Sequence, residues 1–197
     1  MKTKQLQELL WQSLEHERGG VKIYRMALEC AVHSELRKEW THYLEQTERH
    51  VQILTDTCAR LGMDPGVRTP GCEIVRENGV ALVRAMQMAR AAGDPKAAEI
   101  VACEAVVLAE TKDHADWELI GAAAKAATGD MAEALQSAYD QVEDEEDEHL
   151  YHTKGWCREL WLASLGLDAQ LPPPEETQNA NSAIAAAHVK QARMEKQ

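Results

Sequence analysis

Phenylalanine is absent from the chain, and no stretch shows the alternation of β-branched residues that predicts a β-strand. The dominant residues are instead Ala, Leu, Glu, Lys, Arg and Gln, which favour helix over almost the whole length. The 197 residues are enough for one domain, or one domain with a tail, that buries a sizeable core. The sequence therefore predicts an all-α protein.

Long apolar runs are also missing: no stretch reaches the roughly 20 residues of a membrane-spanning helix. The first residues, Met1 to Lys4, lead into polar helix and not into the apolar core of a signal peptide. The formal net charge is −12 and the pI about 5.1, so the surface repels phosphate backbones. We expect no membrane partner, no nucleic-acid partner and a cytoplasmic location.

The five cysteines are odd in number and scattered, and no two of them form a C-x-x-C pair. This pattern argues against a disulfide framework, a zinc ribbon and a rubredoxin-type iron site. Several fall at apolar positions of predicted helices, so we expect buried free thiols. The cysteines are Cys30, Cys58, Cys72, Cys103 and Cys157.

Helical periodicity and end signals divide the chain into four long helices and one shorter helix. Gly62 ends the second helix, and Asp94-Pro95 is a strong start for the third. The Gly19-Gly20 pair costs a helix about 1 kcal/mol per Gly, which suggests a close helix contact there. Two hairpins of long helices joined by a long connection predict a ferritin-like four-helix bundle whose crossover carries a short extra helix. The long helices are expected at about 3–31, 34–61, 94–127 and 130–166, and the shorter one at about 72–92.

The character of the sequence changes after Gly166. Pro172-Pro173-Pro174 and the polar run that follows are typical of a linker. Residues 183–197 could form a helix, but one too short to be stable alone. We therefore assign 1–166 to the helical bundle and 167–197 to a linker and C-terminal tail.

Six acidic residues in a row, 143–148, run directly into His149. Six helical residues cover about 500 to 600° of rotation, so at least one carboxylate faces the core. The apolar stripe places Glu146 and His149 on the inward face, and an inward Glu-x-x-His pair is half of a carboxylate-bridged dimetal centre. The stripe consists of Leu135, Tyr139, Val142, Glu146, His149, Thr153, Trp156 and Leu160.

The other three long helices also carry polar groups on their apolar stripes near mid-length. In dimetal carboxylate bundles two helices supply one Glu each and the other two supply Glu-x-x-His. Carboxylates bridge and neutralise two divalent ions, while neutral imidazoles complete each coordination shell and leave a position open for dioxygen or peroxide. Tyr24, two turns after Glu17, is well placed to support the ligands. The metal-binding residues predicted on this basis are Glu17, His50, Glu110, Glu146 and His149.

One carboxylate of that pattern is missing, because Thr47 stands three residues before His50. Gln46 could coordinate through its carbonyl oxygen but brings no charge, and Glu45 lies about 140° from His50 around the helix. His114, one turn after Glu110, could compensate. The site is therefore expected to be asymmetric, mononuclear or empty. The less favoured donors are Gln46, Glu45, His114 and Glu145, with His152 as a further spare donor.

Each of these residues also has an ordinary structural explanation. A lone Glu on an apolar stripe usually keeps its head in solvent, and a lone inward His is usually a hydrogen-bonded core residue. An acidic run is usually a solvated face. What favours a metal centre is that four helices place such groups at compatible depths.

The second helix carries a more specific signal. Its opening His-Ser-Glu-Leu-Arg-Lys (33–38) and the stretch Leu-Glu-Gln-Thr-Glu-Arg-His-Val (44–51) resemble the YciF-like family of ferritin-like proteins. The resemblance covers residues 5–160 and is at the level of pattern outside 34–62. It implies a ferritin-like bundle, often a homodimer, in bacteria and linked to stress responses. The metal-facing set that it implies is Glu17, Glu45, His50, Glu110 and Glu146.

Two features depart from that family pattern. Gln46 stands where the family's Glu-Glu-Thr motif has its second Glu, and Glu146 with His149 is more similar to the helices of bacterioferritin and rubrerythrin. Our first hypothesis is an oxidoreductase that binds iron or manganese and acts on dioxygen or peroxide. The alternative is a metal-free helical stress or assembly protein that acts through protein–protein contacts. Iron storage in a shell is weaker, because nothing in the sequence signals a cage.

Overall fold

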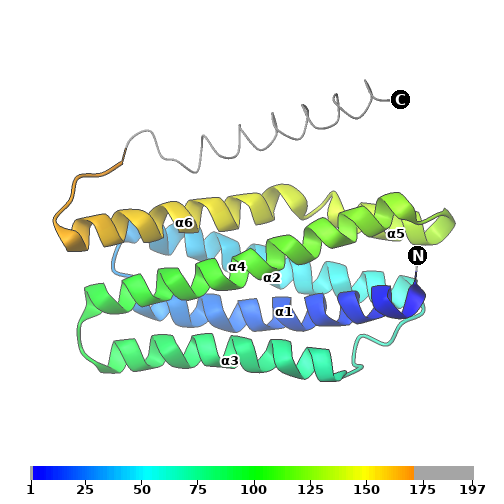
Figure 1. The fold of residues 1–197 in the computed structure, drawn as a ribbon, viewed down its shortest axis with the longest axis horizontal. Coiled ribbons are helices and arrows are strands. Elements are labelled where there is room, and N and C mark those ends of the chain that lie inside the picture. The colour runs from blue at the N-terminus through cyan, green and yellow to red at the C-terminus, as the bar shows by residue number, and fades with distance from the viewer. Residues whose placement is uncertain (1, 171–197) are drawn as a thin grey trace.

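The computed structural model of the chain describes residues 2–170, which form six α-helices and no strand (Figure 1). Each predicted helix is present within a few residues of its expected bounds, except that the last long helix is divided in two. The predicted linker and tail lie outside the described residues beyond Gln170. The helices are α1 (Thr3–Cys30), α2 (Ser34–Arg60), α3 (Pro70–Ala91), α4 (Pro95–Ala126), α5 (Gly129–Tyr139) and α6 (Glu143–Leu165).

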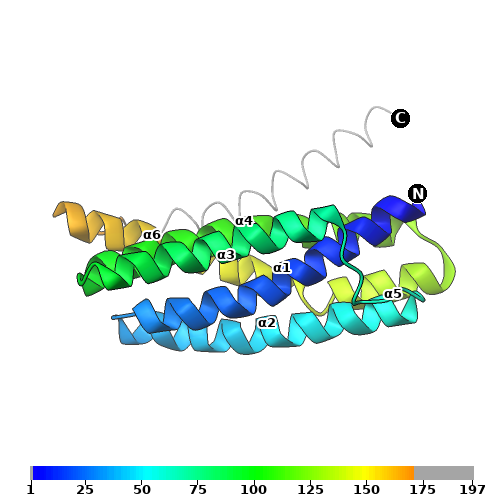
Figure 2. The same ribbon diagram turned by 90° about the horizontal axis from the view of Figure 1, so that it is seen from below.

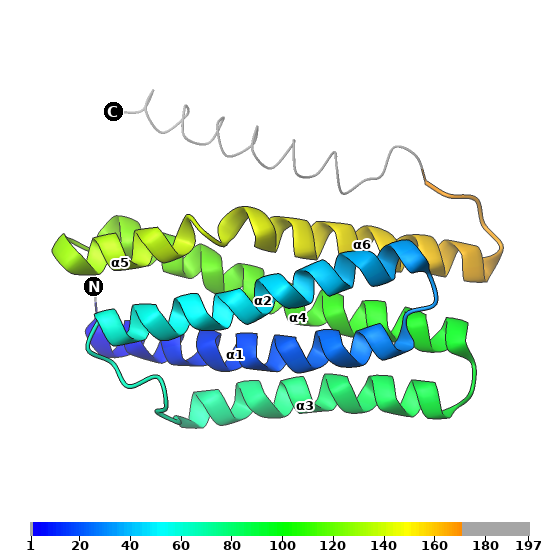
Figure 3. The same cartoon turned by 180° about the vertical axis from the view of Figure 1, so that it is seen from behind.

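The helices pack side by side into an elongated bundle (Figures 1 and 2). Helices α1 and α2 run in opposite directions, α4 runs parallel to α2, and α5 and α6 return parallel to α1. Helix α3 makes the crossover by running the length of the bundle against α1 and α4. Seen from behind, α2 lies between α1 and α6 (Figure 3), so α1, α2, α4 and the α5–α6 pair enclose one common core.

The glycine pair of α1 lies where this helix meets two neighbours. A Cβ on Gly20 would stand 3.2 Å from Cγ2 of Thr47 on α2. On the adjacent face, a Cβ on Gly79 of α3 would stand 3.7 Å from Cα of Gly19. The absent side chain of Gly20 therefore lets α1 approach α2 closely, as the sequence suggested, and that of Gly79 does the same for α3, whereas a Cβ on Gly19 would meet no neighbour.

The predicted continuous helix over 130–166 is wrong at one point, because the chain leaves the α-helical pattern at 140–142. The backbone N–H groups of Gln141 and Val142 bond to carbonyls only three residues earlier, at 3.2 and 3.0 Å. Helix α6 then begins afresh at Glu143, with four acidic residues in its first turn. Negative charge stabilises a helix N-terminus, so the acidic run starts a helix instead of crossing the middle of one.

The inward stripe continues across this break. Leu135 and Val142 are buried before and at the break, and Glu146, His149, Thr153 and Leu160 are buried after it, while Tyr139 and Trp156 are half-buried. The interruption therefore restarts the helix in a phase that keeps the predicted face toward the core. Helix α6 ends at Leu165, where Gly166 adopts a left-handed conformation with φ of 71°.

The apolar core consists of two clusters at different heights of the bundle. The Tyr24 cluster includes Tyr24, Trp40, Met86, Cys103 and Leu160. The Leu10 cluster includes Leu10, Leu54, Trp117, Leu135 and Val142. Along every core helix, most of the buried residues between the two clusters are polar, so a buried polar layer crosses the bundle at mid-height.

The cysteines are free, as expected, and four of the five are buried while Cys157 is half-buried. Burial raises the pKa of the Cys58 thiol and of the Cys157 thiol to about 11. These thiols are therefore inert packing groups at neutral pH. Over residues 2–170, no helix has both the length and the apolar character that crossing a membrane requires.

Candidate metal centre

Five residues of the polar layer converge from four helices. Their side chains are almost completely removed from solvent, with at most 3% of any residue's surface exposed. The two apolar clusters lie above and below these residues along the bundle and limit the access of water from both ends. The five residues are Glu17 on α1, His50 on α2, Glu110 on α4, and Glu146 and His149 on α6.

These side chains form two triads with one member in common. In Glu17–His50–Glu146 and in Glu110–His149–Glu146, one ligand atom from each residue lies within 4.8 Å of the others. Nδ1 of His50 is 3.5 Å from Oε1 of Glu17 and 3.0 Å from Oε1 of Glu146. Nδ1 of His149 is 3.5 Å from Oε2 of Glu110 and 3.5 Å from Oε1 of Glu146. Each triad could hold a metal ion, and Glu146 is placed to bridge the two ions.

Both imidazoles point Nδ1 into the centre and are held from behind through Nε2. Nε2 of His50 is 2.7 Å from Oε2 of Glu145, and Nε2 of His149 is 2.9 Å from Oε1 of Gln46. The two rings are nearly parallel, with centroids 5.8 Å apart. Hydrogen bonds of this kind fix the orientation of a ligating imidazole. Gln46 and Glu145, which the sequence offered as weaker ligands, therefore lie behind the histidines.

The pKa values of the carboxylates reflect crowding without a cation. Burial, followed in importance by contact with Tyr24 and the charge of Glu17, leaves the pKa of Glu110 at about 8. Burial and then the charge of Glu110 raise the pKa of Glu146 to about 7. Both values lie far above that of a free carboxyl because negative charge is being concentrated in an environment without water.

The environment shifts the pKa values of the two histidines in opposite directions. Burial lowers the pKa of His149 to about 4, so its imidazole is neutral and has a lone pair available for a metal. Burial also opposes protonation of His50, but the charge of Glu17 and contacts with Glu145 and Glu146 outweigh it and raise the pKa to about 11. A proton on His50 thus supplies part of the positive charge that the carboxylates attract.

The centre contains most of the buried polar atoms that lack a hydrogen-bond partner in residues 2–170. Such atoms are rare in folded proteins and cost about 1–3 kcal/mol each. A cation in each triad would satisfy them all, so the residues fit a pair of metal ions. The atoms concerned are Glu17 Oε2, His50 Nδ1, Glu110 Oε2, both Glu146 oxygens and His149 Nδ1.

Aromatic side chains close the centre on both sides. Trp117 donates its indole N–H to Oε1 of Glu17 at 2.9 Å. The Tyr24 ring meets His149 edge-on with centroids 6.0 Å apart, and burial and the charge of Glu110 raise the pKa of its hydroxyl. Tyr43 packs against His149 with centroids 4.4 Å apart. Tyr24 thus lies beside the triads, where the sequence placed it.

Two of the weaker candidates are not at the centre. Glu45 is exposed on α2, because its helical position points away from that of His50. His114 turns outward from α4 and contacts Oδ1 of Asp147 at 2.7 Å. Neither residue reaches the triads, so the missing second-helix carboxylate is not replaced by them.

One carboxyl group of the polar layer was not identified from the sequence. Asp113 on α4 is 3% exposed and its Oδ1 has no hydrogen-bond partner. Burial, and then the charges of Glu17 and Glu146, raise its pKa well above the usual value. The only sequence signal is its position three residues after Glu110, which puts both carboxyls on one helical face.

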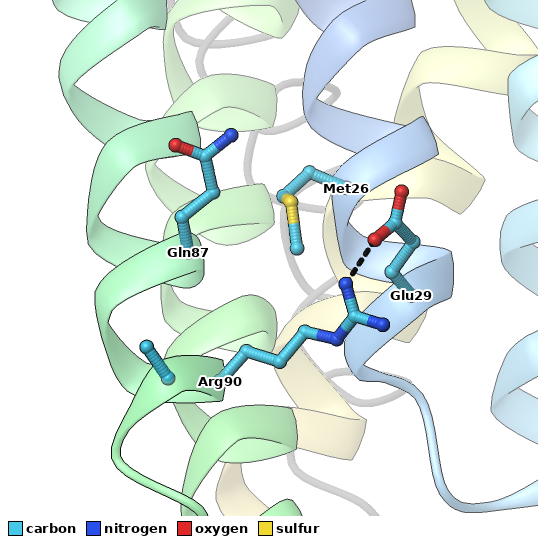
Figure 4. A pocket seen from close by; sticks show the side chains of 5 residues that line it. Met26, Glu29, Gln87 and Arg90 are labelled. Carbon is cyan, nitrogen blue, oxygen red and sulfur yellow. Dashed lines mark hydrogen bonds and ion pairs between the residues drawn. The ribbon is translucent and has the colours of Figure 1, made fainter.

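A surface pocket of about 400 Å³ lies elsewhere, between α1 and α3 (Figure 4). Arg90 forms an ion pair with Glu29 across its rim, and Met26 and Gln87 line the sides. The pocket contains no residue of the triads. The chemistry of the buried centre is therefore independent of this surface feature.

Comparison of the chain with protein-family models, with curated proteins and with solved structures finds no match. The fold and the centre define an all-helical bundle with buried carboxylate and histidine clusters that could hold metal. Any functional assignment therefore depends on the geometry and chemistry of that centre.

Proposed function

We propose that the chain is a ferritin-like protein that binds two iron or manganese ions between α1, α2, α4 and α6 and acts on dioxygen or peroxide. The observation that carries the proposal is the pair of buried triads that share Glu146. Nδ1 of His50 approaches Oε1 of Glu146 to 3.0 Å, but neither atom, nor the other converging atoms of the centre, has a hydrogen-bond partner such as a structural cluster would provide. Two cations would give each of those atoms a partner.

The donor set favours iron or manganese. Each triad offers two carboxylates and one imidazole, and neither contains a thiolate. Oxygen-rich sites with imidazole suit iron and manganese, whereas soft thiolate ligands select zinc or copper(I). The three carboxylates Glu17, Glu110 and Glu146 balance most of the charge of two divalent ions. Such ions, once bound, would supply the electrons that reduce dioxygen or peroxide.

The protein's own residues would position and isolate these ions. Glu146 would bridge them, and Nδ1 of His50 and of His149 would each bind one. The apolar clusters above and below would keep bulk water away, which strengthens every electrostatic interaction inside the centre. Because Glu110 and Glu146 hold protons without metal, binding would release protons from the chain.

The arrangement of the helices supports the ferritin-like assignment. The core helices run in the order up, down, down, up, and a crossover segment returns along the bundle between the second and third of them. Together with the resemblance of residues 44–51 to the YciF-like family, this leads us to propose a cytoplasmic homodimer with a role in the stress response.

The test is metal content, measured by elemental mass spectrometry on untagged protein purified without chelator and then loaded with Fe(II) or Mn(II). We expect about two metal ions per chain, as in other dimetal bundles. Glu146→Ala removes the shared ligand and should abolish both. Asp144→Ala, which removes an exposed acid two residues away, should leave the content unchanged. Protein that binds no metal under these conditions would contradict the proposal.

One observation favours the second function, a metal-free assembly protein. Large apolar side chains are exposed on α3 and α4: Ile74 and Met88 on α3, and Leu108 and Leu119 on α4, are each more than half exposed. A protein that acts through contacts would use exposed apolar residues of this kind where they adjoin one another. In that case Glu146→Ala would stabilise the protein with or without metal, because it removes a buried carboxyl that has no partner.

A further inference from the structure

The two halves of the centre are built reciprocally across α2 and α6, but they differ in one functional group. Glu145 on α6 holds His50 of α2, at 2.7 Å, and Gln46 on α2 holds His149 of α6, at 2.9 Å. The group behind one imidazole is therefore a carboxylate and the group behind the other is an amide.

The two groups constrain their histidines to different degrees. An ionised carboxylate only accepts hydrogen bonds, so Glu145 fixes the proton of His50 on Nε2 and directs Nδ1 at the carboxylates. An amide both donates and accepts, so rotation of the Gln46 side chain can satisfy either tautomer of His149. Metal binding at His50 therefore displaces the proton on Nδ1 and leaves the one that Glu145 holds on Nε2, whereas metal binding at His149 must also select a tautomer.

The charge near the two imidazoles differs as well. Glu145 adds a negative charge next to His50, where Gln46 adds none next to His149. Arg49 contacts Glu145 from the outside, but its side chain is 48% exposed and its charge is screened by water. The hydrogen bond from His50 to Glu145 is formed by a ring that is fully buried and is not screened in this way. The His50 half is thus the more strongly attracting of the two for a cation.

We propose that the two halves bind metal unequally, with the Glu17–His50–Glu146 half filled first and the Glu110–His149–Glu146 half second. The inference rests on the proposed dimetal function. A carboxylate behind a ligating imidazole makes it a stronger donor, and changes to such partners alter metal affinity by about 10–100-fold. When metal is scarce, the chain would hold one ion, and chemistry that needs two ions would begin only as the metal supply rises.

The experiment is a calorimetric titration of the metal-free, full-length protein with Mn(II), followed in parallel by electron paramagnetic resonance. We expect two binding steps whose affinities differ by about 10–100-fold. At one equivalent of Mn(II), the spectrum should show the six-line signal of an isolated ion. At two equivalents, magnetic coupling between the neighbouring ions should broaden the spectrum, and the six-line signal should be lost.

Isosteric substitutions test whether the group behind each histidine causes the difference in metal affinity. Glu145→Gln should weaken the first step by about 10–100-fold, and Gln46→Glu should strengthen the second by a similar factor. The double variant keeps the formal charge of the chain and should invert the order. His149→Ala reports that order. Added to the original sequence, it should leave the tight binding step intact, and added to the double variant, it should remove that step.

Asp144→Asn is the matched control, since it removes an exposed charge beside Glu145 and should change neither step. Circular dichroism establishes that every variant is folded. Two equal steps in the original protein, or equal effects of Glu145→Gln and Asp144→Asn, would overturn the inference and leave the dimetal function standing. Failure to bind any Mn(II) would overturn both.

Discussion

The apolar clusters and the polar layer between them are equally buried but are stabilised in different ways. In the Tyr24 and Leu10 clusters, side chains such as Trp40 and Leu54 are fully buried against other apolar groups. Burial of this kind stabilises the fold by about 25 cal/mol per Å². In the polar layer, Glu146 is equally buried, yet neither of its oxygens has a hydrogen-bond partner.

This difference indicates what each region contributes. The clusters explain why the helices associate, and the polar layer lowers the stability that they provide unless something neutralises it. A bundle selected for stability alone would carry apolar residues at these positions. The layer contains residues that could hold a metal ion, and the clusters fix their positions.

The largest effect is expected in an apolar cluster. Trp40→Ala removes a fully buried indole and should cost about 3–5 kcal/mol of the free energy of unfolding. Urea denaturation should show the same loss with and without Mn(II), because Trp40 does not contact the triads. A loss below about 1 kcal/mol would mean that this cluster does not hold the bundle together.

A smaller effect is expected in the polar layer, and unlike the effect of Trp40→Ala it should depend on Mn(II). Mn(II) at a hundred times its dissociation constant should stabilise the original protein by about 2.7 kcal/mol. Glu146→Gln should abolish this gain while leaving the metal-free protein at least as stable, since the neutral amide replaces a crowded carboxyl. Thermal melts with and without Mn(II) measure both. If the variant were stabilised by Mn(II) as much as the original, Glu146 would not be a ligand.

The polar layer should also make the metal-free protein sensitive to alkaline pH. Folding raises the pKa of Glu110 from 4.5 to about 8 and that of Glu146 from 4.5 to about 7. It raises the pKa of His50 from 6.5 to about 11. Between pH 6.5 and 8 the folded state therefore holds more protons than the unfolded state, and stability falls as pH rises.

The slope is about 1.4 kcal/mol per pH unit for each excess proton. Below pH 6.5 the unfolded chain protonates His149, whose folded pKa is lowered to about 4, so the trend weakens there. With Mn(II) bound, the carboxylates stay ionised and the fall should disappear. Denaturation curves at pH 6.5 and 8, with and without Mn(II), test this; equal stability of the metal-free protein at both values would contradict it.

The smallest effects are expected from the glycine pair that adjoins the layer. A Cβ on Gly19 would meet nothing within 4 Å, so Gly19→Ala should add up to about 1 kcal/mol through helix propensity. A Cβ on Gly20 would press on Thr47, next to Gln46, and Gly20→Ala should lose most of that gain and weaken metal binding. Identical melting temperatures and affinities for the two variants would exclude a close contact of α1 with α2.

Much of this arrangement could be predicted because it is local in the sequence. The stripe from Leu135 to Leu160 identified Glu146 and His149 as inward-facing, and end signals such as Gly62 and Asp94-Pro95 located the helices. The break at 140–142 was not predicted, because periodicity alone does not reveal a change of hydrogen-bond pattern that keeps the same face inward.

The supporting groups were harder to predict because they depend on how neighbouring helices are rotated. Gln46 and Glu145 appeared as weak ligands, and only the packing of α2 against α6 shows that each holds the other helix's histidine. Asp113 carried no signal beyond its spacing from Glu110, and its burial follows from the packing of α4 in the bundle. Contacts of this kind are not encoded by the pattern of any single helix.

The most direct test of the central claim is anomalous diffraction at the manganese edge from crystals of the Mn(II)-loaded protein. The account predicts two peaks at mid-height of the bundle, one in each triad, on either side of the Glu146 carboxylate. No peak in either triad, or manganese only at surface acids such as Asp144 and Glu148, would contradict it.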